Sequence, residues 1–174
     1  MAGSDAVRSF DEVVQDRTTA LADTLGARLR NLGIPQDEPI KLKLDDIGRV
    51  TTDSPYKEKI ETLFKDDPDL AKAFKDVAGL NAMKAAQKAL EAYETERKAA
   101  RDDDARDAAY GRYTARLMRS QELSGTMTLE DGTLRSASVG FMAKSLGEAA
   151  PAEVPVKAGA KAEQAAAQRV SRTV

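Results

Sequence analysis

Hydrophobic residues recur every three, four or seven positions along much of this chain, which is the spacing of helices with one apolar face. The first predicted helix covers residues 4–32, with Ser4 as its N-cap and Gly33 and Pro35 as stop signals. Its apolar stripe consists of Phe10, Val14, Leu21, Leu25, Leu29 and Leu32.

Two prolines mark the starts of the next helices. Ser54 and Pro55 are predicted to be the N-cap and first residue of a short second helix, and Asp67 and Pro68 those of a third. The third helix is the longest and covers residues 68–99. Its predicted apolar stripe consists of Leu70, Phe74, Val77, Leu80, Met83, Leu90 and Tyr93.

A polar run at residues 101–104 predicts a break and then a fourth helix that ends near Gly125. The third and fourth helices are expected to form an antiparallel pair, because the connection between them is short. The first two helices would then cover the apolar stripe of this pair. Residues 140–146 are expected to add one helical turn.

Two shorter stretches alternate between apolar and polar residues and predict β-hairpins near residues 39–52 and 126–139. Each has an acidic turn with a glycine, Gly48 or Gly132, that is free to take positive φ. Isolated two-stranded hairpins are only marginally stable. The pattern leaves open whether the two hairpins pair into one sheet or pack separately on the helices.

The composition changes after residue 147. Residues 148–174 contain alanines and prolines but no aromatic residue, Leu, Ile or Met, so this segment cannot bury enough apolar surface to offset its ordering entropy. The predicted organisation is therefore a helical domain at 1–147 and a disordered Ala/Pro-rich tail at 148–174. The fold class is mainly α (α+β), with a four-helix core, a long third helix and one or two short hairpins.

The side-chain inventory restricts the chemistry that is available. The 174 residues include no cysteine and no histidine, which excludes thiolate nucleophiles, Cys/His zinc sites and imidazole acid–base catalysis. The 27 basic and 29 acidic residues are interspersed, so no basic run indicates nucleic acid. No apolar run has the length of a membrane span, and the first residues lack a signal-peptide pattern. The expected location is the cytoplasm.

Four groups of carboxylates are candidates for metal or catalytic sites. Asp102, Asp103 and Asp104 are consecutive and point in different directions on a helix, so capping and pairing with nearby arginines explains them better than an ion. Capping likewise explains the aspartates around Pro68, and a solvated face explains Glu58 and Glu61. The two acidic turns lack oxygen ligands at the positions that a calcium loop requires. No metal ion, cofactor, catalytic residue or small-molecule substrate is therefore predicted.

Tyr93, Tyr110 and Tyr113 are the candidate site residues, because they would meet where the third and fourth helices turn back on each other. One interpretation is core packing with the hydroxyls at the rim, and the other is an exposed aromatic patch for a partner.

The leading functional hypothesis is a non-enzymatic interaction or assembly protein that binds a protein partner, or itself, through amphipathic helix faces. One alternative is a secreted or surface-attached module exported without a classical signal peptide, which the composition of the tail suggests. A second alternative, an enzyme that uses carboxylates and a hard cation, is the least favoured.

Overall fold

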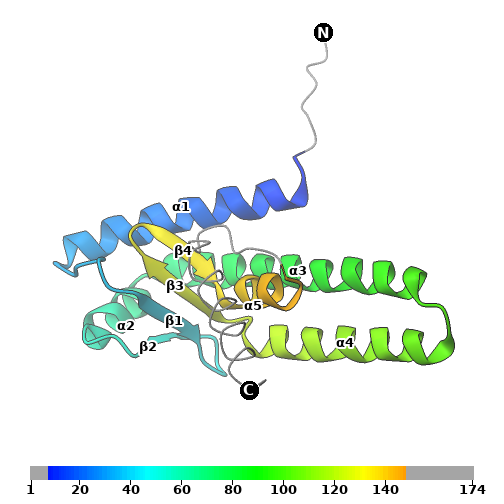
Figure 1. Cartoon of the computed structure of the whole chain (residues 1–174). Coiled ribbons are helices and arrows are strands. Elements are labelled where there is room, and N and C mark those ends of the chain that lie inside the picture. The colour runs from blue at the N-terminus through cyan, green and yellow to red at the C-terminus, as the bar shows by residue number, and fades with distance from the viewer. Residues whose placement is uncertain (1–7, 148–174) are drawn as a thin grey trace, which may run out of the picture. The chain divides into compact units, whose positions relative to one another are not determined.

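The computed structural model describes residues 8–147 (Figure 1). Contacts along the chain group it into two units, Met1–Met142 and Ala143–Val174, and the architecture below is that of the first. The predicted N-cap Ser4 and the predicted tail at 148–174 lie outside the described residues.

The described residues form five helices and four strands, a mainly α (α+β) fold as predicted. The helices are α1 (Phe10–Asn31), α2 (Lys57–Asp66), α3 (Pro68–Ala99), α4 (Asp103–Glu122) and α5 (Ala137–Ser145). The strands are β1 (Ile40–Leu44), β2 (Val50–Thr52), β3 (Thr126–Glu130) and β4 (Thr133–Ser136). α5 begins directly after β4 and is longer than the single turn expected from the sequence.

The starts of α3 and α4 follow the sequence signals. Asp67 accepts a hydrogen bond at Oδ1 from the Leu70 N–H (3.1 Å), and Pro68 is the first helical residue. Asp102 caps α4 in the same way through the Ala105 N–H (2.8 Å). Each aspartate satisfies one of the N–H groups that a helix start leaves without an intrahelical partner.

The starts of α1 and α2 were predicted wrongly. α1 begins at Phe10, because Ser9 and Glu12 form a capping box in which each side chain accepts the other residue's N–H. α2 begins at Lys57 rather than Pro55. The Ser54 hydroxyl accepts the Tyr56 N–H (3.2 Å) in a turn that precedes the helix, so Ser54 is not its N-cap.

The two predicted hairpins pair into one antiparallel sheet with the strand order β2-β1-β3-β4. The central pair joins β1 to β3, with Ile40 opposite Leu129 and Leu42 opposite Met127. Both glycine turns have positive φ as expected, and in the second turn Asp131 (φ 49°) precedes Gly132 (φ 77°). Positive φ at both central residues is the turn that matches the twist of a hairpin.

One face of the sheet packs with α1, α2 and α3 around the main core. Inward positions on the strands alternate with outward ones, so that Leu42 is buried while Lys41 and Lys43 are exposed. The fully buried large side chains of this core come from α1, α2, the first half of α3 and the sheet, together with Ile34 from the α1–β1 connection. They include Leu25, Leu29, Leu42, Ile60, Phe74, Met127 and Leu129. We refer to α1, α2, the sheet and residues 68–81 of α3 as the α/β body.

Candidate protein-interaction surface

The second half of α3 and most of α4 form an antiparallel pair that we call the α3–α4 arm, residues 83–99 and 103–118 (Figure 1). The pairing of these helices confirms the sequence prediction. Every buried residue of the arm is an alanine: Ala85, Ala89 and Ala109, each at most 1% exposed. Alanine lets two helices approach closely, but each buried methyl group removes little apolar surface from water.

The large apolar side chains of the arm lie outside this alanine interior. Five large hydrophobic residues are exposed in the described part of the chain, and four of them belong to the arm: Met83, Leu90, Tyr110 and Met118. Met83 and Leu90 were expected in the apolar stripe of α3, and the structure contradicts this for both (60% and 44% exposed). The buried face of α3 instead runs through Ala78, Asn81, Ala85 and Ala89.

The three predicted tyrosines meet on one side of the arm. The rings of Tyr93 and Tyr113 are stacked, with centroids 5.0 Å apart, and Tyr110 meets Tyr93 edge-on at 5.9 Å. The Tyr110–Tyr113 distance is 6.4 Å. Leu90 lies one turn before Tyr93 on α3, and Leu117 one turn after Tyr113 on α4, so they extend the same surface. We refer to these five residues as the tyrosine patch.

The tyrosine patch combines apolar rings with free polar groups. Tyr93 and Tyr113 are half-buried and Tyr110 is 58% exposed. Within residues 8–147 no tyrosine hydroxyl of the patch takes part in a hydrogen bond, and none is a buried unpaired atom. Rings that stack while their hydroxyls stay available give rigid contact area plus hydrogen-bonding capacity, which is why tyrosine is enriched at interfaces.

An ion-pair cluster holds the two helices of the arm together beside the tyrosines. Glu96 on α3 accepts hydrogen bonds from Arg112 Nε (2.9 Å) and Arg116 Nη1 (3.0 Å) on α4. Burial acts to raise the pKa of Glu96, but the hydrogen bonds from the two arginines outweigh it and hold that pKa below its ordinary value. No sequence signal pointed to this cluster, because 16 and 20 residues separate the partners.

Two of the three consecutive aspartates at the start of α4 have structural roles. Asp102 caps the helix, and Asp103 pairs with Arg106 (2.8 Å) while remaining 93% exposed. Between residues 8 and 147, no group of three or more acidic side chains is arranged to hold a metal ion.

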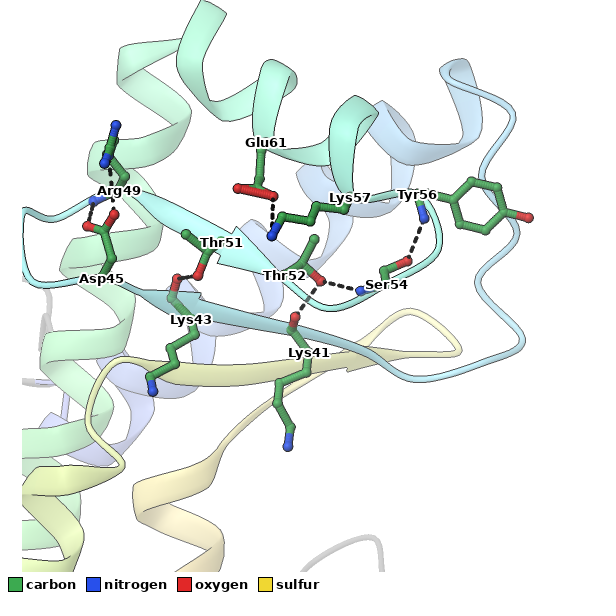
Figure 2. Close-up of polar contacts among 10 residues, drawn as sticks. All are labelled: Lys41, Lys43, Asp45, Arg49, Thr51, Thr52, Ser54, Tyr56, Lys57 and Glu61. Carbon is green, nitrogen blue, oxygen red and sulfur yellow. Dashed lines mark hydrogen bonds and ion pairs between the residues drawn. The ribbon is translucent and has the colours of Figure 1, made fainter.

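The acidic turn between β1 and β2 uses its carboxylate internally (Figure 2). Asp45 Oδ1 accepts the backbone N–H groups of Ile47 (3.1 Å) and Arg49 (2.8 Å), and Asp45 Oδ2 pairs with Arg49 Nε (3.2 Å). The hydrogen bond from the Arg49 backbone is the main reason why the pKa of Asp45 is lowered. This carboxylate stabilises a turn through three hydrogen bonds.

Glu61 on α2 stands out from the other carboxylates. Its Oε2 lies 3.8 Å from Lys57 Nζ (Figure 2), and in the described part of the chain it is the one buried side-chain oxygen or nitrogen without a hydrogen bond. The sequence predicted a solvated face for Glu61, but the residue is half-buried and one of its carboxylate oxygens is buried.

Comparison with models of known protein families, with curated proteins and with solved structures found no match to this chain. Across residues 8–147 no helix has both the length and the hydrophobicity needed to cross a bilayer.

Proposed function

We propose that this chain is a non-enzymatic interaction protein and that the tyrosine patch on the α3–α4 arm is its protein-binding surface. The observation that carries the proposal is the inverted packing of the arm, which buries alanines and leaves Leu90, Tyr110 and other large apolar side chains in solvent. A partner that covered them would remove apolar area from water and gain rigid aromatic contacts.

The roles of the polar side chains favour binding over catalysis. The chain has no histidine or cysteine. The carboxylates weighed as sites at Asp67 and Asp102 cap helices, and Glu96 is paired with two arginines. The partner is a protein or a second copy of the chain, because a patch spread over two helices is suited to a complementary side-chain surface.

Site-specific photocrosslinking tests this proposal in the producing cell. A photoreactive phenylalanine analogue at position 110 is expected to give covalent adducts with another polypeptide, which mass spectrometry then identifies. Ile47 provides a matched control, because among residues 8–147 it is the exposed large hydrophobic residue that lies outside the arm, in the β1–β2 turn (71% exposed). Equal or absent crosslinking at positions 110 and 47 would contradict the proposal.

A double variant, Leu90→Ser with Tyr110→Ser, adds a quantitative test. Both side chains are exposed, so the fold is expected to survive while the crosslinked partner binds at least tenfold more weakly. Sedimentation over a range of concentrations shows whether the partner is a second copy.

A further inference from the structure

A groove runs along α1 on the side where α1 faces α2 and α3. It consists of two hollows, of about 500 and about 580 Å³, whose linings share Arg28 and Asp67. Arg28 Nη1 and Asp67 Oδ2 are 2.7 Å apart, so this ion pair bridges the groove where the two hollows adjoin. The hydrogen bond from Arg28 is the main cause that lowers the pKa of Asp67.

The floor of the larger hollow is apolar and its two sides differ in charge. Leu21, Leu70 and Val77 are buried beneath it, and Ala20 and Ala73 leave room because their side chains end at Cβ. The remaining charged residues are arginine on α1 and aspartate on α3: Arg17, Asp69 and Asp76.

Two of the charged side chains on the sides of this hollow, Arg17 and Asp69, are available to a ligand. Neither Arg17 nor Asp69 takes part in an ion pair among residues 8–147. In the described part of the chain, Asp76 pairs only with the exposed Lys72, at 3.3 Å. The larger hollow of the groove therefore presents a basic side on α1 and an acidic side on α3, with an apolar floor between them.

We infer that this groove binds an amphipathic helix with acidic side chains along one flank and basic side chains along the other. The sides of the groove are helix surfaces, which offer no free backbone groups for an extended peptide to pair with, whereas a helix satisfies its own backbone. From Arg17 to Arg28 the groove follows about 16 Å of α1, the length of about three helical turns. The acidic flank would face Arg17, and the basic flank would face Asp69 and Asp76.

Designed helical peptides of about 16 residues, a length at which an alanine-based helix can form, test this inference by fluorescence anisotropy with the full chain. All peptides carry leucines at positions i, i+4 and i+7. One has a glutamate flank and a lysine flank, one has two glutamate flanks and one has two lysine flanks. The mixed-charge peptide is expected to bind about tenfold more tightly than either of the others, because like charges across an interface are strongly unfavourable.

Three variants locate the binding. Ala20→Met fills the groove at an exposed helix position and should abolish binding of the mixed-charge peptide without unfolding the protein. Arg17→Glu makes both walls acidic and should shift the preference to the two-lysine peptide. Arg30→Glu makes the same charge change on α1 outside the groove lining and should leave the preference unchanged.

Several results would overturn the inference. These are no saturable binding of the mixed-charge peptide at millimolar concentration, equal binding of all three peptides, or no effect of Ala20→Met. Concentration-dependent NMR shifts at groove residues without peptide would identify a second copy as the occupant instead. The groove and the tyrosine patch share no residues, so this inference does not depend on the proposed function. The double variant Leu90→Ser with Tyr110→Ser should therefore leave peptide binding unchanged.

Discussion

The α/β body and the α3–α4 arm share one continuous helix, α3, but pack in opposite ways. In the body, α3 buries Leu70, Phe74 and Val77 in a core of large aliphatic and aromatic side chains from every neighbouring element. In the arm, the same helix buries only Ala85 and Ala89. The change follows from the sequence, in which the large apolar residues on the buried face of α3 end at Val77 and are followed by Ala78, Asn81 and further alanines.

This difference separates the part of the molecule that accounts for folding from the part that is available for binding. Burying large side chains accounts for most of the hydrophobic stabilisation of a domain, so the body should carry most of the free energy of unfolding. The arm depends on helix propensity, close alanine contacts, aromatic contacts and the Glu96 ion pairs. Several of its large side chains, Leu90 and Tyr110 among them, remain in solvent, where a partner can reach them.

The largest expected effect is that of truncating the centre of the body. Phe74 is fully buried and meets Phe64 edge-on, with ring centroids 5.8 Å apart. Phe74→Ala should lower the free energy of unfolding by about 3–5 kcal/mol, measured by urea denaturation. A loss below about 1 kcal/mol would break the comparison, because the body would then not be the main source of stability.

A smaller effect is expected from enlarging the interior of the arm. Ala89 is 0% exposed, and a leucine there has no room unless α3 and α4 separate. Ala89→Leu should lower the free energy of unfolding by about 1–3 kcal/mol. Hydrogen exchange should show faster exchange across α4, while amides of α1 and the sheet stay protected, because local opening of the arm leaves the core intact. Ala108→Leu, at an exposed position of α4, is the control and should leave exchange across α4 nearly unchanged.

The body could be predicted well from the sequence because its signals are local. Alternation in β1 and β3, the glycine turns at Gly48 and Gly132, and the Asp67-Pro68 helix start each involve a few adjacent residues. The start of α1 was misplaced because the capping box of Ser9 and Glu12 lies further along the chain than Ser4. The start of α2 was misplaced because the Ser54 hydroxyl is used in a turn that precedes the helix. The pairing of the two hairpins could not be settled, since it depends on contacts between strands more than 80 residues apart.

The arm was predicted less completely. The spacing of Tyr93, Tyr110 and Tyr113 placed them on facing sides of two helices, and their rings do meet. Met83 and Leu90 were assigned to the buried face of α3 because they are large and apolar. The buried face of this part of α3 consists of alanines, which a search for large apolar residues overlooks. The alanines at positions 85 and 89, one helical turn apart, were the signal that could have revealed it.

A modest, pH-dependent effect is expected at Glu96. Glu96→Gln removes the charge that pairs with Arg112 and Arg116 and should destabilise the protein by about 1 kcal/mol at neutral pH. Because folding lowers the pKa of Glu96, its contribution is complete above the ordinary value of 4.5 and is lost as the pH falls through the lower, folded-state pKa. The difference between wild type and variant, followed by thermal unfolding from pH 7 to pH 3, should therefore shrink only in the acid range. A difference that stayed constant across this range would mean that the charge of Glu96 does not stabilise the arm.

The smallest effect on stability is expected at the exposed face of the arm, which differs most from the buried core of the body. Leu90→Ala removes a large apolar side chain that is 44% exposed and places a better helix former in its position, so stability in the monomer should change by less than about 0.5 kcal/mol. The measurement is most informative when repeated at low and high protein concentration. If two copies associate through the tyrosine patch, Leu90 becomes buried only in the associated form, and the cost of Leu90→Ala should grow with concentration. A loss of unfolding free energy well above 1 kcal/mol at every concentration would instead mean that Leu90 is buried in the folded monomer. The arm would then be packed in the same way as the body.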